Sequence, residues 1–577
     1  MQMAWVPSAG EVLEVVHAAE IYLLATCVVV SLLLLKRARD STRQRRTHAK
    51  LVEAIGSADP RLAWSTLTLA QKLREGEVTS YEMVELYISQ LERVDVHLHA
   101  VVGNCFKDAL RDAKDADDLL AEARRKGSTD SLPDFLGVPF ISKEVFEYPG
   151  FPFTGGIVGR REVRGRARNP VLQRLQDEGA IILACGNTSE ACMWSESSNP
   201  VHGRTCMPYD LRRTCGGSSG GTAALVSALG GSFGVTSDVG GSTRIPALYN
   251  GLFGHKPTGG AVPNTRCIPK VHGLVERYCQ LGPTARYAHD LFPLLETMAG
   301  RLKLEDLEDA TEEELEHLEA QRKYMLDMQW PHPATVRMRE LKYYVVWDQP
   351  GSSMGITRAR DPEMLAAQRR VVRALETSLG VKVHAVEFDA LKRCFDLWSA
   401  MLLEAQTVPF AEIMSEGLGS VIWPVWELVK SVLTFGYGSQ HTLPALGLAC
   451  TERFRHLTPR MHRNNLELGE ELRLEMNDLL GEDGVLIFPG LPTPAPLHGP
   501  LPNLLYFADF GATGIFNVLE LPATAVPTGL SRDKKLLPTG VQLVAANGND
   551  HLTIATAMHL ESLGVAGWVP PLAATPR

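Results

Sequence analysis

Several patterns that identify common enzyme classes are absent from this chain. It has neither an H-E-x-x-H pair of metal-binding histidines nor a G-x-x-x-x-G-K-[ST] phosphate loop, so it carries no usual metalloprotease or P-loop motif. None of its ten cysteines forms a C-x-x-C pair, which argues against a zinc site or a disulfide framework. The net charge of −9 gives no reason to expect nucleic-acid binding. We therefore expect no metal, no cofactor, and reduced thiols that pack as small hydrophobes.

Lysine and arginine are also absent from the first 35 residues. Residues 21–35 form an uncharged, mostly apolar run, and six cations follow between Lys36 and Arg46. A helix of that run is only about 22 Å long, short of the roughly 30 Å hydrocarbon layer, but a start at Val12 gives enough length. Because a secretory signal has its positive charge before the apolar run, this order favours a retained anchor over 12–35 with the catalytic body in the cytoplasm. Acids near the start of that segment keep a buried or surface-lying amphipathic helix open as the alternative.

After the expected anchor, short apolar runs alternate along the sequence with stretches of helical periodicity. The sequence TSYE at 79–82 is a capping-box pattern, and Val84, Ile88 and Leu91 then recur at helical spacing. This alternation predicts an α/β fold with a mixed, largely parallel sheet covered by helices on both faces. The apolar runs expected to form strands are 137–141, 181–184, 342–347, 485–488 and 540–545.

Two other segments differ from the rest in composition. Residues 303–330 are acidic and rich in Glu and Leu, which is typical of a solvated surface helix. Residues 418–450 contain an amphipathic stretch that begins at Pro424, a residue favoured at the first helical position. This stretch either packs on the core or dips into a bilayer surface, and the residues alone leave both readings open.

Two serines lie twenty-four residues apart in glycine-rich loops, and a lysine precedes them. Ser218 occurs in the sequence CGGSSGG, Ser242 in SDVGGSTR, and Lys143 at the end of GVPFISK. Glycines leave backbone N–H groups bare and allow a substrate carbonyl to approach closely. A lysine moved out of water can lose its charge and act as a base. These are the parts of a serine hydrolase that works without histidine.

The sequence GGSSG around Ser218 also matches the G-x-S-x-G nucleophile elbow of α/β-hydrolases. That elbow needs a strand directly before the serine and an acid and a histidine after it. The preceding residues, 209–215, are loop-like, and His551 is the available histidine. Another alternative is that the glycine clusters are merely turns, which leaves the helix-like apolar segment 223–229 between two serine loops unexplained.

The sequences GGSSGG, DVGGSTRIP, GLFGHKPT and GVPFISKE together resemble the amidase-signature family. The likeness covers approximately residues 65–570, which it identifies as one catalytic domain between a basic linker at 36–64 and a tail at 571–577. Residues 1–11 form a further tail before the anchor. Within the family, the anchor and the sequence at 423–430 are most similar to fatty-acid amide hydrolases of the second, vertebrate-type form.

This resemblance implies a Ser–Ser–Lys triad. Ser242 is the implied nucleophile, Ser218 the bridging serine held by a cis peptide, and Lys143 the base. Lys143 must be neutral to accept a proton, which burial and hydrogen bonds to the serines could achieve. Ser218 then passes the proton from Ser242 to Lys143 and later to the leaving amine.

The resemblance also implies an oxyanion hole and a set of supporting residues. One backbone donor in such a hole typically contributes about 3 kcal/mol to stabilising the transition state. The implied donors are the N–H groups of Val239, Gly240, Gly241 and Ser242. The residues implied to brace the loops are Ser219, Asp238 and Arg244, and the one implied to line the substrate pocket is Cys192.

The function implied is that of a membrane-anchored serine amidase that hydrolyses long-chain fatty-acid amides, both primary amides and N-acylethanolamines, to fatty acid and amine. Segment 418–450 is then a membrane cap or acyl channel, and the endoplasmic reticulum or lipid droplets are the expected membranes. The expected partners are a lipid amide and a membrane, and the resemblance is compatible with a homodimer.

Other readings remain at this point. An amidotransferase subunit shares the triad but transfers ammonia to aminoacyl-tRNA, and the anchor at 12–35 counts against it. A general acylamide or ester hydrolase fits the same motifs. A catalytically silent lipid-binding protein is the third alternative, and the intact Lys143, Ser218 and Ser242 count against it.

Overall fold

The computed structural model describes residues 47–574 except for 301–311, 313, 314, 316–322, 324, 349, 354, 355, 435–437, 453–458, 500–506 and 534. The predicted tail at 1–11 and the predicted anchor at 12–35 lie outside the described residues, as does most of 303–330. Among the described residues, no helix combines the length and the apolar character needed to cross a membrane. From Leu51 onward the chain forms one compact unit.

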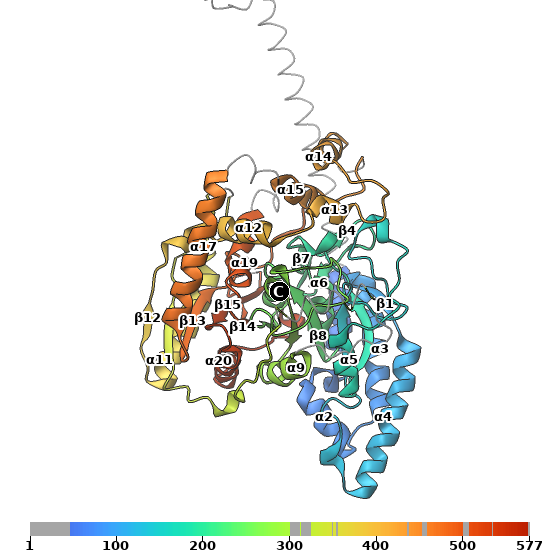
Figure 1. Ribbon diagram of the computed structural model, residues 1–577. Helices are drawn as coiled ribbons and strands as arrows, with labels where there is room; N and C mark the ends of the chain where they lie inside the picture. The colour runs from blue at the N-terminus through green and yellow to red at the C-terminus, as the bar shows by residue number, and fades with distance from the viewer. Residues whose placement is uncertain are drawn as a thin grey trace, which may run out of the picture. The chain divides into compact units, whose positions relative to one another are not determined.

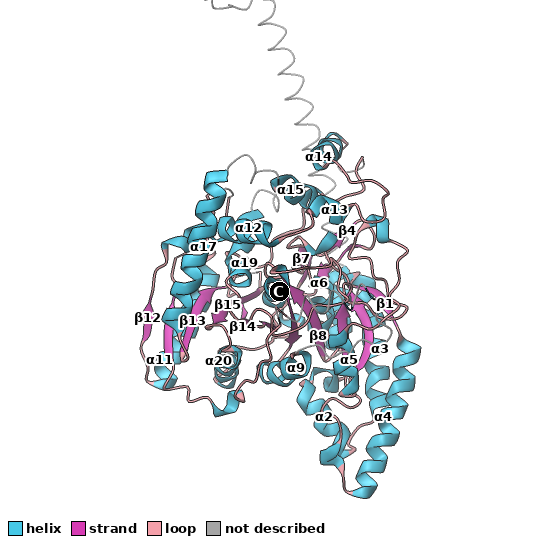
Figure 2. Cartoon of the chain, in the orientation of Figure 1, coloured by secondary structure: helices cyan, strands magenta, loops and turns pink. Residues whose placement is uncertain are grey.

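An eleven-stranded sheet runs through this unit (Figures 1 and 2). From one edge to the other its strands are β1 (Val101–Asn104), β3 (Ile181–Gly186), β2 (Pro139–Lys143), β8 (Phe233–Asp238), β10 (Gln280–Ala285), β9 (Phe253–Lys256), β14 (Ala523–Leu530), β15 (Pro538–Val544), β13 (Gly484–Pro489), β11 (Lys342–Val345) and β12 (Val383–Ala385). Two separate pairs of short strands are β4 (Ser198–Asn199) with β5 (Gly203–Arg204) and β6 (Cys206–Met207) with β7 (Asp210–Thr214).

All five apolar runs identified in the sequence form strands of this sheet, namely β2, β3, β11, β13 and β15. The sheet is mixed, but the expectation that it is largely parallel is wrong, because six of its ten neighbouring pairs are antiparallel. Parallel neighbours need a long crossover, whereas antiparallel neighbours can be joined by a short turn. β14 and β15 are antiparallel neighbours of this kind, since β14 ends at Leu530 and β15 begins at Pro538.

Helices cover both faces of the sheet, as the alternating sequence pattern predicted. In β9, the side of Gly254 faces Ala247 of α7 (Arg244–Tyr249), and the next residue, His255, bonds Asp550 of α20 (Asp550–Ser562). Successive side chains of a strand point to opposite faces, so α7 and α20 lie on opposite sides of the sheet. The other α-helices with bounds inside the described residues are α2 (Thr66–Glu75), α3 (Ser80–Leu98), α4 (Phe106–Lys126), α5 (Pro170–Asp177), α6 (Gly220–Ser227), α8 (Val275–Tyr278), α9 (Leu291–Met298), α11 (Pro362–Leu379), α12 (Cys394–Ala405), α13 (Phe410–Met414), α14 (Pro424–Leu433), α15 (Leu443–Thr451), α17 (Pro459–Leu480) and α19 (Gly511–Val518).

The start of the unit agrees with the sequence at one point and differs at another. Thr79 caps α3 by accepting a hydrogen bond from the N–H of Glu82, so the predicted helix start is confirmed. Residues 36–64 were expected to be a polar linker, yet 51–56 are helical and Leu51, Ile55 and Leu62 are buried. Leu51 and Ile55 lie one helical turn apart, and Leu62 lies in the following 3₁₀ turn, so burying the three side chains attaches this stretch to the core.

Two further expectations are revised within the described residues. The end of the acidic stretch, 325–330, contains no helix and buries Met325 and Trp330. The predicted tail begins with a 3₁₀ turn at Pro571–Ala574, where Leu572 lies against Gly56. The core accepts the large apolar side chains of Met325 and Trp330 in spite of their polar neighbours, whereas Leu572 remains 37% exposed.

Segment 418–450 contains α14 and α15, which pack side by side near α13 (Figure 1). The helix α14 begins at Pro424, as predicted. Its apolar face is not covered by the described residues: Trp423 is 59% exposed and Trp426 54% exposed. The other large apolar side chains exposed there are Val421, Val425, Val429, Val432 and Leu433. Single exposed apolar residues are ordinary, but a contiguous set of this kind marks a surface for interaction.

Candidate active site

The sheet brings the predicted lysine and the second serine loop to the same edge. β2 and β8 are parallel neighbours, with Ser142 opposite Val235. Lys143 is the last residue of β2, and Asp238 is the last residue of β8. Because the carboxyl ends of parallel strands lie at the same edge, Lys143 is placed beside the loop that carries Ser242.

Lys143 is buried and hydrogen-bonded to two serines. Its Nζ lies 2.6 Å from Oγ of Ser218 and 2.9 Å from Oγ of Ser237. Its side chain has no exposed surface. The peptide bond between Gly217 and Ser218 is cis, as the family resemblance implied. The lysine and the first serine of the predicted triad are therefore in direct contact and shielded from water.

Ser237 is a contact of Lys143 that the sequence analysis did not identify. It lies in β8 directly before Asp238 and lines the same cavity as Ser218 and Ser242. Its position inside the motif SDVGGSTR was visible, but its role was not, because the side chain of a strand residue can face either side of the sheet. The structure shows that it faces the lysine.

The loop that carries Ser242 is held by Asp238. The carboxylate of Asp238 accepts hydrogen bonds from the N–H of Gly241 at 2.6 Å and from the N–H of Thr243 at 3.1 Å. Arg244 donates to both oxygens of the same carboxylate at 3.0 Å, and both side chains are fully buried. Ser219 donates its N–H to the carbonyl of Ser242 at 3.3 Å. Ser219, Asp238 and Arg244 thus occupy bracing positions around the two serine loops.

Asp238 is ionised in this setting. Burial by itself would raise the pKa of its carboxyl, but the charge and hydrogen bonds of Arg244 outweigh burial and lower that pKa to about 2. The buried pair is completed by two amides, because Arg244 also donates to Oδ1 of Asn517 and Oε1 of Gln542, each at 2.8 Å. A buried charge pair with its donors satisfied in this way makes the loop rigid.

Three consecutive carbonyls of the Ser242 loop accept hydrogen bonds from side chains. Asn517 donates to the carbonyl of Asp238 at 2.8 Å, Trp398 to that of Val239 at 2.9 Å, and Thr513 to that of Gly240 at 2.8 Å. Because a peptide unit is planar and trans, fixing one carbonyl points the N–H of the next residue the opposite way. The orientation of three N–H groups of the predicted oxyanion hole is therefore set by residues far along the chain.

The four predicted oxyanion donors are not equivalent. The N–H of Gly241 already donates to the carboxylate of Asp238. Within the described part of the chain, no acceptor is bound to the N–H of Val239, Gly240 or Ser242. These three N–H groups remain available to a substrate oxygen, whereas the N–H of Gly241 attaches the loop to the carboxylate of Asp238.

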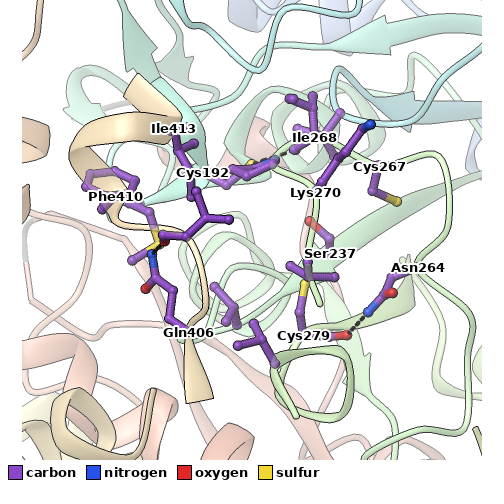
Figure 3. Close-up of a pocket in the computed structure, with 18 of the residues that line it drawn as sticks. Cys192, Ser237, Asn264, Cys267, Ile268, Lys270, Cys279, Gln406, Phe410 and Ile413 are labelled. Atoms are coloured by element: carbon purple, nitrogen blue, oxygen red, sulfur yellow. Dashed lines mark hydrogen bonds between the residues drawn. The ribbon is translucent and has the colours of Figure 1, made fainter. Parts of the chain in front are cut away.

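Ser218, Ser237 and Ser242 open into a cavity with about 840 Å³ of empty space, its open mouth included. Figure 3 shows its walls, with Gln406, Phe410 and Ile413 contributed by a segment remote from Cys267, Ile268 and Cys279. Most side chains that line it are apolar. Burial raises the pKa of Cys279 to about 12 and that of Cys267 well above its usual value, so both thiols stay neutral and form part of an apolar wall.

Cys192 lies where this cavity meets a smaller one. The smaller cavity has about 310 Å³ of empty space and is also lined by Ser242, with Trp194, Trp398 and Phe510 forming aromatic walls. Cys192 and Met193 line both cavities. Ser242 therefore stands between a larger apolar space and a smaller aromatic one, an arrangement suited to a substrate with two unequal halves.

The nucleophile-elbow alternative does not fit these contacts. The short strand β7 that precedes Ser218 belongs to a separate two-stranded pair rather than to the central sheet. In the described residues the hydrogen-bonded partner of the Ser218 hydroxyl is Lys143 and not a histidine. The glycine loops are also more than turns, because they bring Ser218 and Ser242 to the wall of one cavity and Ser218 to the buried lysine.

Comparison with known proteins shows which family this chain resembles. The model of the family described as Amidase matches residues 82–554. Fatty-acid amide hydrolase 2-B of Danio rerio is 40% identical over 521 residues, covering 89% of this chain and 91% of that protein. Fatty-acid amide hydrolase 2 of Homo sapiens is 36% identical over 524 residues, with coverage of 89% and 91%.

Solved structures share the fold at lower identity. 6-Aminohexanoate cyclic dimer hydrolase complexed with substrate matches with a TM-score of 0.66 at 24% identity, covering 89% of this chain and 99% of that one. A fatty acid amide hydrolase matches with a TM-score of 0.65 at 20% identity, covering 88% and 86%. The predicted fold is thus confirmed as an α/β amidase-type fold.

Proposed function

This chain belongs to the amidase family, and from that membership we propose that it is a fatty-acid amide hydrolase working at a membrane surface through Lys143, Ser218 and Ser242. The names of the relatives at 36–40% identity support the substrate class. The observation that carries the proposal is the buried Lys143 amine, 2.6 Å from the hydroxyl of Ser218, which together with Ser242 lines a mostly apolar cavity.

The reaction begins at Ser242. Its hydroxyl attacks the amide carbon while Ser218 takes its proton and passes its own to the neutral amine of Lys143. The C–N bond then breaks as the proton returns from Lys143 through Ser218 to the leaving nitrogen, which departs as a neutral amine. An ester bond now joins the acyl group to Ser242. Water, deprotonated along the same route, hydrolyses that ester and releases the fatty acid.

The substrate oxygen carries negative charge in both tetrahedral intermediates. The N–H groups of Val239, Gly240 and Ser242 are the proposed donors to it, since that of Gly241 is already bound. One such donor contributes about 3 kcal/mol when it is fixed before the reaction starts. The side-chain contacts to the carbonyls of Asp238 and Val239 supply that fixing.

The two cavities suggest how the substrate lies. The larger one, with its apolar wall and neutral thiols, is suited to a long acyl chain. The smaller one, on the other side of Ser242, is suited to the amine half. Primary amides and N-acylethanolamines are the proposed substrates, because both combine a long apolar chain with a small amine.

The membrane part of the proposal has two supports. Segment 12–35, which contains the apolar run 21–35, is the proposed single-pass anchor, and it lies outside the described residues. The exposed apolar face of α14 is the second proposed contact, and its tryptophans are residue types favoured at a lipid interface. The endoplasmic reticulum or lipid droplets are the proposed membranes, with the catalytic unit on the cytoplasmic side.

The test uses the full-length protein in detergent. We expect a fluorophosphonate probe to label Ser242 and the wild type to hydrolyse a panel of acyl amides, with long chains preferred. The variant Ser242→Ala should lose both labelling and turnover, while Ser57→Ala, a surface hydroxyl change, should lose neither. Labelling that survives in Ser242→Ala would place the nucleophile elsewhere. A labelled wild type that hydrolyses no acyl amide would overturn the proposed function.

A further inference from the structure

The pocket wall contains a buried carboxylate that the proposed mechanism does not use. Glu190 is buried and directly precedes Ala191 and Cys192, whose φ angles are 50° and 63°. Residues other than glycine rarely adopt this left-handed backbone conformation, and they keep it only where the surrounding structure requires it. Ala191, Cys192 and Met193 all line the larger cavity. The conformation of this pocket loop, residues 189–193, therefore shapes the cavity directly.

Both oxygens of Glu190 contact the start of α15. Oε1 lies 2.7 Å from Nδ1 of His441, and Oε2 accepts a hydrogen bond of 2.7 Å from the N–H of Thr442. His441 is also buried, and Thr442 is the N-cap residue of α15. Because a buried carboxylate is costly without such donors, these contacts fix the start of α15 to the pocket loop.

The other end of α15 is fixed to a second part of the cavity wall. Glu452 is the C-cap residue of α15, and its Oε1 accepts a hydrogen bond of 2.6 Å from the N–H of Phe410. Phe410 begins α13, and both Phe410 and Ile413 of that helix line the cavity (Figure 3). The helix α15 thus joins two wall segments that are more than two hundred residues apart in sequence.

From this arrangement we propose that Glu190 is a positioning residue that sets the width of the acyl cavity and thereby its preference for long chains. The proposal rests on the proposed function and goes beyond it. The hydrogen bonds of Glu190 go to α15, whereas Lys143 contacts Ser218 and Ser237. Loss of the Glu190 contacts should therefore weaken the binding of a long acyl chain and leave the rate of the chemical step unchanged.

The experiment compares three variants of the full-length protein in detergent. Glu190→Gln removes the charge, and His441→Phe removes one partner while keeping a ring. Thr442→Pro removes the donating N–H at a residue whose φ of −74° suits proline. The matched control is His462→Phe, which breaks a histidine–carboxylate contact of 3.0 Å with the exposed Glu404, on α17 and α12.

Turnover is measured with amides of six, twelve and eighteen carbons. We expect KM for the longest amide to rise about tenfold in all three variants, the size of one charge-assisted hydrogen bond, with kcat and the six-carbon KM unchanged. A uniform change across chain lengths, no change, or the same change in His462→Phe would overturn the proposal. If Glu190→Gln does not fold, the other two variants decide.

Labelling separates this proposal from the proposed function. Alkyl fluorophosphonates of short and long chain report the cavity without any amide turnover. If the wild type is labelled but hydrolyses no amide, the proposed function fails, and the chain-length dependence of labelling in the three variants still decides the role of Glu190. An unchanged ratio of long-chain to short-chain labelling rates would overturn it.

Discussion

The side-chain amide of Asn517 donates a hydrogen bond of 2.8 Å to the main-chain carbonyl of Asp238, 279 positions earlier in the sequence. Trp398 and Thr513 make the same kind of contact with the next two carbonyls. The loop that carries Ser242 therefore takes its conformation from α12 and α19, and not only from its own glycines.

The first prediction concerns Trp398. Trp398→Phe keeps an aromatic ring but removes the N–H that fixes the carbonyl of Val239, and with it the direction of the Gly240 N–H. We expect kcat for acyl-amide hydrolysis to fall about tenfold, less than the 10²–10³-fold loss on deleting an oxyanion donor outright. Steady-state kinetics with Trp64→Phe as the control would show this. An unchanged kcat would mean that the glycine loop keeps its conformation without the hydrogen bond from Trp398.

The second prediction concerns the proposed base. Lys143→Met keeps the length of the side chain and removes its amine, so activation of Ser242 should be lost. We expect the rate of fluorophosphonate labelling to fall about 10²–10⁴-fold, the usual contribution of a general base. Ser237→Ala, which removes the other hydrogen bond of Lys143, should slow labelling by less than about tenfold. Normal labelling of Lys143→Met would exclude this lysine as the base.

The third prediction concerns the buried pair beneath the loop. Arg244→Met leaves the Asp238 carboxylate without its charge partner in a site with no exposed surface. We expect the free energy of unfolding to fall by about 3–5 kcal/mol, as for other buried pairs with one partner removed. Urea denaturation followed by circular dichroism measures it. Arg111→Met, which breaks the exposed pair with Asp108, should leave the midpoint nearly unchanged.

The fourth prediction concerns pH. Burial raises the pKa of Glu276 from 4.5 to about 8, against a hydrogen bond from the backbone of Gly273. Between these two values the folded protein holds a proton that the unfolded chain has lost, so this residue makes stability fall as pH rises. The glutamine of Glu276→Gln cannot titrate, so the variant should not lose stability in this way. Its free energy of unfolding minus that of the wild type should therefore increase from pH 5 to pH 8, by about 1.4 kcal/mol per pH unit at most. Urea denaturation at several pH values tests this, with exposed Glu92→Gln as the control. A constant difference would show that Glu276 is ionised in the folded state.

The fifth prediction concerns α14. If its apolar face enters the bilayer, bromine-labelled acyl chains should quench the fluorescence of Trp423 and Trp426 in the reconstituted protein. Changing both to Phe should reduce the quenched fraction, whereas changing the buried Trp398 to Phe should not. Equal quenching before and after the double change would place this face away from lipid.

The sequence indicated which residues lie together at the candidate site, because these residues are also close together in the chain. Lys143 and the two serine loops fall within one stretch of about a hundred residues, and each loop has a glycine pattern with a direct physical reason. Five of the eleven strands were predictable because each contains a short, continuous apolar run.

What could not be predicted depends on distant residues. Nothing local distinguishes Trp398, Thr513 or Asn517 from other core side chains, and their role follows from contacts with a loop far away in sequence. The prediction of a largely parallel sheet was wrong for a related reason. Periodicity identifies a strand but does not give its neighbours, and β9 pairs with β14 across some 270 intervening residues.

The pairing of β9 with β14 has a consequence for folding during synthesis. Every proposed reacting group precedes β9, while Trp398, Thr513 and Asn517 come after it. A ribosome that adds about 5–20 residues per second therefore finishes the loop that carries Ser242 at least several seconds before the side chains that orient this loop are synthesised. We expect the nascent chain to stay unreactive until its last quarter has emerged and docked, which delays hydrolysis of lipid until synthesis is nearly complete.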